Sequence, residues 1–183
     1  MEQIKHEELS EILERTNGWI ENCDSKSSII LSGMGVAAGI FLATDYISKF
    51  IDIIQFMYEN MNIWTVLYLI FGSLSICLLL YGAFLLIEVL FSRINTAEFE
   101  DRGVKTDSII FFSSIAKNKT LSKYRGKLKK CSAEQLDNDI ISQIYVCSLI
   151  CDKKFSLYKK GLICSLAGFI IFMIIAIIGA LVT

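Results

Sequence analysis

Three stretches without a charged residue constrain the fold of this chain more than any other feature. They run from Ser27 to Thr44, from Asn60 to Ile87 and from Gly161 to Thr183, and they contain 18, 28 and 23 residues. A helix needs about 20 apolar residues to cross a hydrocarbon core about 30 Å thick. The second and third stretches are long enough. The first is marginal because serines and glycines dilute it, so a helix buried in a bundle is its alternative interpretation.

The composition agrees with membrane spans. The hydrophobic set makes up 54% of the 183 residues, the mean hydropathy is +0.53, and the chain has no proline. Soluble domains are usually about 45–50% apolar, so the excess belongs in spans, and helices without proline run unbroken. The sequence therefore predicts an all-α membrane protein with about three transmembrane helices. In the first span Gly33, Gly35, Ala38 and Gly39 favour close contact between helices.

Lysine and arginine predict the orientation. Residues 1–26 contain seven acids and three bases but no apolar core of a signal peptide, so we expect the first span to insert as an uncleaved anchor. Residues 45–59 contain one base, and residues 93–160 contain fourteen. By the positive-inside rule, residues 1–26 and 93–160 are expected in the cytoplasm, with 45–59 outside.

The segments outside the spans are predicted to be helical. Residues 4–23 repeat apolar side chains at helical spacing, and their acidic opposite face favours packing on protein over anionic lipid. This gives an N-terminal amphipathic helix within 1–26. Residues 45–59 form a second amphipathic pattern, joining the two spans of residues 27–92. It is interpreted as a cover at the outer interface or as a seam between subunits.

The segment 93–160 divides into a basic insert and a long helix. An apolar run from Ser108 to Ala116 is too short to span and predicts a short buried helix or a re-entrant piece. Residues 117–130 hold seven bases and no acid. Ser132 and Gln135 have the spacing of a capping box. Apolar residues then recur every three or four positions, which predicts one helix of about 50 residues, about 75 Å long, that continues into the last span at 161–183.

The charged residues near the membrane leave several interpretations open. Lys117, Lys119, Lys123 and Arg125 could contact anionic headgroups, bind a small anionic ligand or only enforce topology. Nucleic acid fits poorly, because few aromatic residues are interleaved with the bases. Next to the first span, Asp24 and Lys26 form either a polar site or a plain interfacial pair.

No set of residues supports catalysis. The single histidine, His6, lies in an acidic helix near the terminus, where an exposed position is expected, and the chain lacks a phosphate-binding loop. The six cysteines do not complete a metal site and are expected to be reduced. Glu88 either reaches the interface or acts as an intramembrane carboxylate with a gating role. We therefore expect no enzyme activity, no metal and no cofactor.

Several short motifs resemble the Pycsar transmembrane effectors. The residues that carry the resemblance are Trp19-Ile20-Glu21-Asn22-Cys23-Asp24-Ser25-Lys26-Ser27-Ser28, Ile110-Phe111-Phe112-Ser113-Ser114-Ile115-Ala116, Tyr124, Leu136-Asp137-Asn138-Asp139-Ile140 with Gln143-Ile144, and Lys153 or Lys154 before the last span. The resemblance covers most of residues 17–175. The chain departs from the family pattern at Ser27, where alanine is common, and at Ser113-Ser114, where Gly-Asp is expected. The second departure weakens the case for a nucleotide contact there.

The resemblance implies a specific function. Such an effector resides in the bacterial inner membrane, responds to a cyclic pyrimidine nucleotide (cUMP or cCMP) made on phage infection, and impairs membrane integrity so that infection is aborted. The implied mechanism fits a homo-oligomer. The candidate ligand-binding residues are Asp24 and Lys26, together with Lys117, Lys119, Lys123 and Arg125 as ligand or lipid contacts. The residues themselves fit a second hypothesis, a non-catalytic membrane scaffold or accessory subunit whose long helix docks a cytoplasmic partner.

Overall fold

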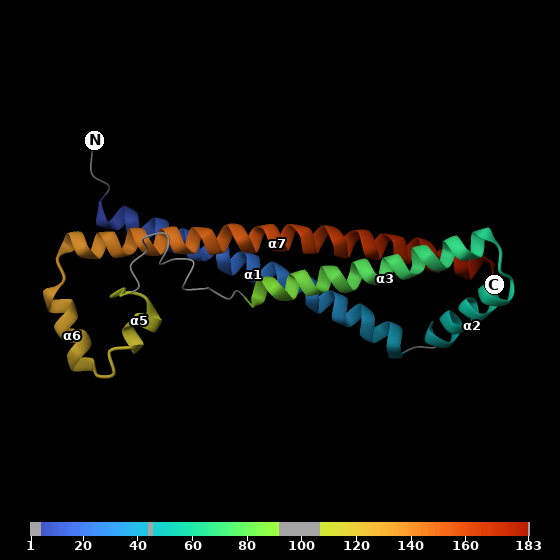
Figure 1. Ribbon diagram of the computed structural model, residues 1–183, viewed down its shortest axis with the longest axis horizontal. Helices are drawn as coiled ribbons and strands as arrows, with labels where there is room; N and C mark the ends of the chain where they lie inside the picture. The colour runs from blue at the N-terminus through green and yellow to red at the C-terminus, as the bar shows by residue number, and fades with distance from the viewer. Residues whose placement is uncertain (1–4, 44–45, 92–106, 183) are drawn as a thin grey trace. The chain divides into compact units, whose positions relative to one another are not determined.

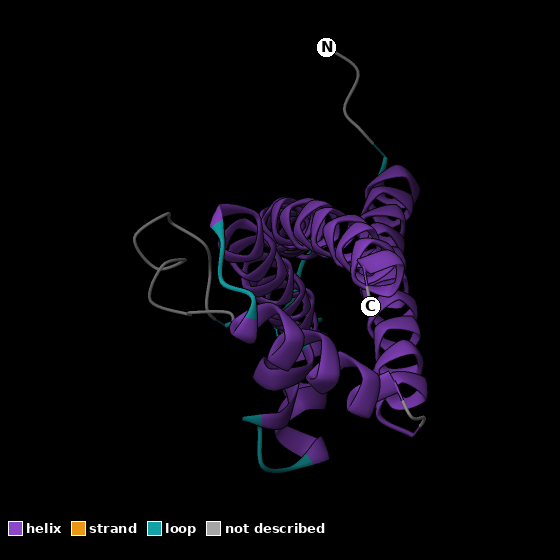
Figure 2. Ribbon diagram, turned by 90° about the vertical axis from the view of Figure 1, so that its right-hand side faces the viewer, coloured by secondary structure: helices purple, strands orange, loops and turns teal. Residues whose placement is uncertain are grey.

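Helices make up nearly all of the chain that can be described. The computed structural model describes residues 5–43, 46–91 and 107–182, and within these ranges it contains no strand (Figures 1 and 2). The helices are α1 (His6–Ala43), α2 (Tyr46–Glu59), α3 (Ile63–Leu90), α5 (Phe112–Ala116), α6 (Leu121–Lys130) and α7 (Ala133–Val182). The prediction of an all-α protein is confirmed.

Three of these helices, α1, α3 and α7, are long and apolar enough to cross a membrane. The predicted N-terminal amphipathic helix and the first span form one element, because α1 continues without a break for 38 residues. The predicted long helix is confirmed by the 50 residues of α7. Its predicted capping box is present too: the backbone N–H of Gln135 donates to Ser132 Oγ at 3.2 Å, and the backbone N–H of Ser132 donates to Gln135 Oε1 at 3.1 Å.

Contacts divide the chain into two compact units, which we describe separately. The polar unit comprises residues 1–22 and 92–154, and the membrane unit comprises residues 23–91 and 155–183. The helices α1 and α7 each contribute residues to both. The division into segments that charge predicts, and the side of the membrane that each segment occupies, stay predictions.

The membrane unit exposes large apolar side chains along its helices. Leu80 and Phe84 of α3 are 68% and 60% exposed, and Ile170 and Leu181 of α7 are 57% and 82% exposed. Soluble monomers rarely present a continuous apolar surface, whereas hydrocarbon solvates one without penalty. Together with the three candidate spans, this surface identifies a membrane protein.

Small residues let α3 and α7 approach each other closely. A Cβ atom added at Gly82 would lie 2.7 Å from the backbone nitrogen of Ser165 and 2.9 Å from the carbonyl oxygen of Gly161. A Cβ atom at Gly168 would lie 2.8 Å from the backbone nitrogen of Leu79. These distances are shorter than real Cβ contacts, so only glycine fits at either position. Backbone-to-backbone packing of this kind is typical of helices in lipid.

The glycines that the sequence singled out for helix contact behave differently. A Cβ atom added at Gly33, Gly35 or Gly39 meets nothing within 4 Å, and Ala38 is exposed. Among the described residues, the close helix contact is therefore made by α3 and α7, and none of them packs on these glycines of α1.

The predicted helix at 45–59 is confirmed as α2, which packs against α3 and α7. Met57, Tyr68 and Ile175 form the buried cluster of this end of the unit. Phe41 of α1 makes edge-to-face contacts with Phe50 and Phe172, at ring-centroid distances of 6.0 and 5.9 Å. Other apolar residues of α2, such as Ile51, are exposed, so its apolar stripe is only partly covered within the chain.

The close contact at Gly82 predicts that alanine substitutions at two glycines of α3 change the stability of the protein in opposite directions. We expect Gly82→Ala to destabilise the protein by about 1–3 kcal/mol, because the new methyl group overpacks a backbone contact. Gly72→Ala is the matched control, since its Cβ would meet only Ile175 at 3.9 Å, an ordinary contact. It should stabilise the helix by about 0.5–1 kcal/mol. Thermal unfolding in detergent, followed by circular dichroism, measures both, and a Gly82→Ala protein as stable as the parent would contradict the packing argument.

Candidate functional site

The polar unit holds the segment 107–131 against the first part of α7. The sequence predicted a short buried helix or a re-entrant piece from Ser108 to Ala116. The helix α5 is shorter, because it begins at Phe112, and the apolar run is not all buried. Phe112 is 75% exposed, whereas Ser108 and Ser114 are 4% exposed. The buried side chains of this segment are therefore the two serines, whose polar groups need partners in the fold.

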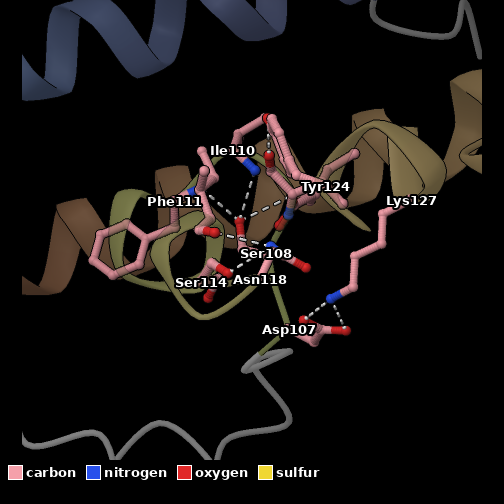
Figure 3. Close-up of polar contacts among 11 residues, drawn as sticks. Asp107, Ser108, Ile110, Phe111, Ser114, Asn118, Tyr124 and Lys127 are labelled. Atoms are coloured by element: carbon pink, nitrogen blue, oxygen red, sulfur yellow. Dashed lines mark hydrogen bonds and ion pairs between the residues drawn. The ribbon is translucent and has the colours of Figure 1, made fainter. Parts of the chain in front are cut away.

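A buried carboxylate on α7 supplies one set of partners. Asp139 Oδ2 accepts from the hydroxyl of Ser108 at 2.9 Å and from the backbone N–H of Ile109 at 2.8 Å. Ser108 Oγ in turn accepts from the backbone N–H groups of Ile110 at 3.2 Å and Phe111 at 2.9 Å, as Figure 3 shows around Ser108. We call these bonds the Asp139 knot. They connect the start of the segment to α7. They also give an acceptor to four donors that lie before the first turn of α5, three backbone N–H groups and the hydroxyl of Ser108.

The same carboxylate has a second oxygen, which accepts no hydrogen bond from the part of the chain that the structure describes. Asp139 is 6% exposed, and its Oδ1 atom is buried with no hydrogen-bond partner among the described residues. Buried polar atoms without a partner are rare in native proteins and call for an explanation.

Further contacts fix α6 beside the knot. The hydroxyl of Tyr124 donates to the carbonyl oxygen of Ile109 at 2.9 Å, and Asn118 Nδ2 donates to the carbonyl oxygens of Ser114 and Ile115 at 3.0 and 2.9 Å. Lys127 Nζ reaches both carboxylate oxygens of Asp107, at 2.7 and 3.0 Å (Figure 3). The orientation of the basic helix α6 is thus fixed by hydrogen bonds and an ion pair with residues that precede it in the sequence.

These contacts leave a cleft of about 380 Å³ in the polar unit, which we call the Asp139 cleft. It is lined by Asp107, Ile109, Lys127, Lys130, Cys131, Gln135 and Asp139. Sites for small ligands usually measure about 300–1,000 Å³ and combine apolar surface with a few converging polar groups. Lys130 forms no ion pair with any residue that the structure describes, so the cleft offers an uncompensated cation as well as a buried acceptor.

A second, wider cleft of about 760 Å³ lies in the same unit, between the first turns of α1 and α7. At its edge His6 Nδ1 lies 2.6 Å from Asp137 Oδ1. The sequence predicted an exposed histidine. The side chain is half exposed, but it contacts α7, because the acidic N-terminal helix packs on protein as expected.

The predicted ligand residues lie in both units. Lys117, Lys119, Lys123 and Arg125 are exposed, and none of them lines either cleft. Asp24 is half-buried and Lys26 is exposed in α1; residues two positions apart point to different faces of a helix, so this pair does not converge. Glu88 is exposed near the end of α3. Asp24, Lys26 and Glu88 belong to the membrane unit, and the four bases belong to the polar unit.

Sequence reasoning missed the residue at the centre of the site. Asp139 lies on the stripe of α7 that buries Ile140 and Gln143, and a carboxylate on a buried helical stripe is a signal that could have found it. The cations of the cleft, Lys127 and Lys130, are in the predicted basic run but lie closer to its end than the four residues that we singled out.

These features define a class of protein, an all-helical membrane protein with a polar unit that contains a cleft of ligand size. The Pycsar effector protein domain matches residues 8–181. The Pycsar effector protein GmPycTM of Gulbenkiania mobilis is 32% identical over 181 residues, which cover 92% of this chain and 90% of that protein. No solved structure matches. The chain belongs to the Pycsar effector protein family, which confirms the resemblance and implies a part in antiphage defence.

The Asp139 knot generates a prediction for local stability. Ser108→Ala removes a donor to Asp139 and the acceptor of two backbone N–H groups, and we expect it to cost about 1–3 kcal/mol. Residues 107–116 should then exchange their amide hydrogens faster, as measured by mass spectrometry on the full chain in detergent. Ser122→Ala, at an exposed position of α6, is the matched control and should change nothing. Equal protection in both variants would show that the knot does not hold the segment.

Proposed function

We propose that this protein is an antiphage effector of the bacterial inner membrane, activated by a cyclic pyrimidine nucleotide, cUMP or cCMP. Activation impairs the integrity of the membrane and stops growth of the infected cell before phage are released. The observation that carries this proposal is the family match, which extends over residues 8–181 and so includes both the membrane unit and the polar unit.

The two units support a division of labour in this proposal. The polar unit carries the basic helix α6 and the clefts, and it has the chemistry to bind a small anion. The membrane unit has the apolar surface on which a change of arrangement would disturb lipid packing. Activation then requires that the nucleotide binds one arrangement more tightly than the other.

The required difference in affinity is within reach of a mononucleotide. A shift from 1:99 to 99:1 between two arrangements needs about 5.5 kcal/mol of differential binding. Hydrogen bonds to charged groups contribute about 1.5–3 kcal/mol each. Two to four such bonds, made in only one arrangement, would therefore drive the switch.

The predicted site residues have distinct roles in this proposal. Lys117, Lys119, Lys123 and Arg125 attract the anionic ligand. Asp24 and Lys26 contribute polar groups on two faces of α1, where this helix leaves the cytoplasm. Glu88 contributes to gating. Several copies of the chain assemble in the bilayer, and the open small-residue face of α1 is suited to contact between copies.

The topology in this proposal places residues 1–26 and 93–160 in the cytoplasm and residues 45–59 outside. A membrane-impermeant maleimide applied to intact spheroplasts should label Lys49→Cys but not Arg125→Cys, and both positions are exposed on their helices. Lysis should make position 125 reactive, while the parent chain measures the background from its native cysteines. Labelling at position 125 before lysis would show that residues 93–160 lie outside, and it would contradict the proposal.

Leakage from liposomes tests the activity itself. With the full chain reconstituted in vesicles loaded with a self-quenched dye, cUMP or cCMP should release the dye, and cAMP or cGMP should release much less. The double variant Asp24→Ala with Lys26→Ala should reconstitute normally and leak less.

The same assay measures single variants of the other candidate residues, Lys117→Ala, Lys119→Ala, Lys123→Ala, Arg125→Ala and Glu88→Gln. Vesicles that stay intact with every cyclic nucleotide would end the proposal, and harmless overexpression with capture of a stable cytoplasmic partner would instead favour the scaffold.

A further inference from the structure

We propose that the Asp139 cleft binds a small phosphorylated molecule that also carries an N–H or O–H donor. The phosphate is held by Lys130 and Lys127, and the donor bonds to Asp139 Oδ1, the carboxylate oxygen that has no partner among the described residues. The identity of the occupant as a cyclic pyrimidine nucleotide rests on the proposed function, whereas the site itself follows from the contacts in the polar unit.

The unused oxygen of Asp139 is the first argument. The knot needs only one acceptor, because Ser108 and the backbone of Ile109 both donate to Oδ2. An asparagine could serve that purpose with its single oxygen. The second carboxylate oxygen is buried and has no partner among the described residues, yet its residue lines the cleft. A ligand donor that reaches this oxygen would supply the hydrogen bond that the fold leaves out.

The cations of the cleft are the second argument. Lys130 lines the cleft and forms no ion pair with any described residue. Lys127 also lines the cleft and forms an ion pair with Asp107. Both lysines lie in the last turn of α6, where the helix dipole stabilises positive charge. A phosphate in the cleft could bind the ammonium group of Lys130. It could also bind that of Lys127, which would give up part of its contact with Asp107.

The two arguments together set the orientation of the ligand. A phosphate is repelled by the carboxylate of Asp139, so it has to lie on the lysine side while a donor lies on the aspartate side. Cyclic UMP and cyclic CMP each carry one negative charge and offer donors on the base and at the ribose 2′-hydroxyl. Inorganic phosphate brings up to two charges without a separate donor group, so we expect it to bind more weakly than either nucleotide.

An isosteric substitution separates a binding role from a structural one. Asp139→Asn keeps an oxygen that can accept from Ser108 and Ile109, and it replaces the unpartnered oxygen by an NH₂ group. If Asp139 serves only the fold, the variant should be as stable as the parent or more stable, with unchanged binding. If Asp139 accepts from the ligand, thermal stability should be kept while the Kd for cUMP or cCMP rises about tenfold or more.

The experiment uses the full chain in detergent, with isothermal titration by cUMP, cCMP and inorganic phosphate. Lys130→Gln should also raise the Kd for the nucleotides about tenfold, because it removes a charged hydrogen bond. Lys129→Gln is the matched control, since Lys129 is a neighbouring exposed lysine of the same helix and does not line the cleft. Its Kd should stay within about twofold of the parent value.

Dye release from reconstituted vesicles then separates this proposal from the proposed function. Leakage and binding that persist unchanged in both Asp139→Asn and Lys130→Gln would overturn the cleft as the ligand site and leave the proposed function standing. Binding that depends on Asp139 and Lys130, but with no leakage at saturation, would support the cleft and overturn the proposed activity. Absence of binding to the parent chain would overturn both.

Lipid headgroups also combine a phosphate with a hydrogen-bond donor. The last part of the experiment therefore varies the lipid composition of the vesicles. Nucleotide-dependent release should be the same in neutral phosphatidylcholine vesicles and in vesicles with added phosphatidylglycerol. Release that needs phosphatidylglycerol, occurs without nucleotide and is lost in Lys130→Gln would overturn the nucleotide as the occupant. Should Asp139→Asn fail to fold, Lys130→Gln with its Lys129→Gln control still decides the assignment, because Lys130 is exposed and forms no ion pair with a described residue.

Discussion

Hydrocarbon offers no hydrogen bonds, and this constraint governs the membrane unit. Each spanning segment has to satisfy its own backbone, which leaves the helix as the available structure for a chain of this kind. Since apolar side chains gain little by leaving lipid for protein, the helices associate where their backbones can come close. The contact of Gly82 with Gly161 and Ser165 meets that requirement, and most of the large apolar side chains remain exposed to the surroundings.

The polar unit solves the opposite problem. Residues 107–131 form only short helices, so many of their backbone groups have no partner within an element. Side chains supply the missing bonds: Ser108, Asn118, Tyr124 and Asp139 each bond to the backbone of the segment. A network of this sort holds a short segment in one conformation, and it also holds the lysines of α6 at the mouth of a cleft.

The two solutions suit the proposed function, in which a soluble nucleotide changes the state of a membrane protein. A cleft built from side-chain bonds can change arrangement at modest cost, because few apolar contacts are lost when it opens. Helices that pack through glycines contact each other closely at only a few positions, and the rest of their surface faces lipid. The helices α1 and α7 belong to both units, so they are the elements through which a change in one could reach the other.

The prediction from sequence was most complete where local rules decide the structure. The three spans followed from charge-free length, and the 50 residues of α7 followed from a three-to-four-residue repeat without a breaker after the Ser132 capping box. The basic run was visible too. Which of its lysines would line a cleft was not, because the direction of α6 depends on Tyr124 and Asp107, which bond across 15 and 20 residues of sequence.

The amino-acid sequence by itself thus determined the all-helical membrane class, the positions of the spans and the family, because these depend on hydropathy, helical periodicity and short motifs. Only the tertiary structure decided that Gly82, rather than the glycines of α1, makes the close helix contact. It also decided that Asp139 is buried with one oxygen bonded and the other without a hydrogen-bond partner among the described residues. Both outcomes depend on which faces of distant helices meet, and that is set by packing in three dimensions.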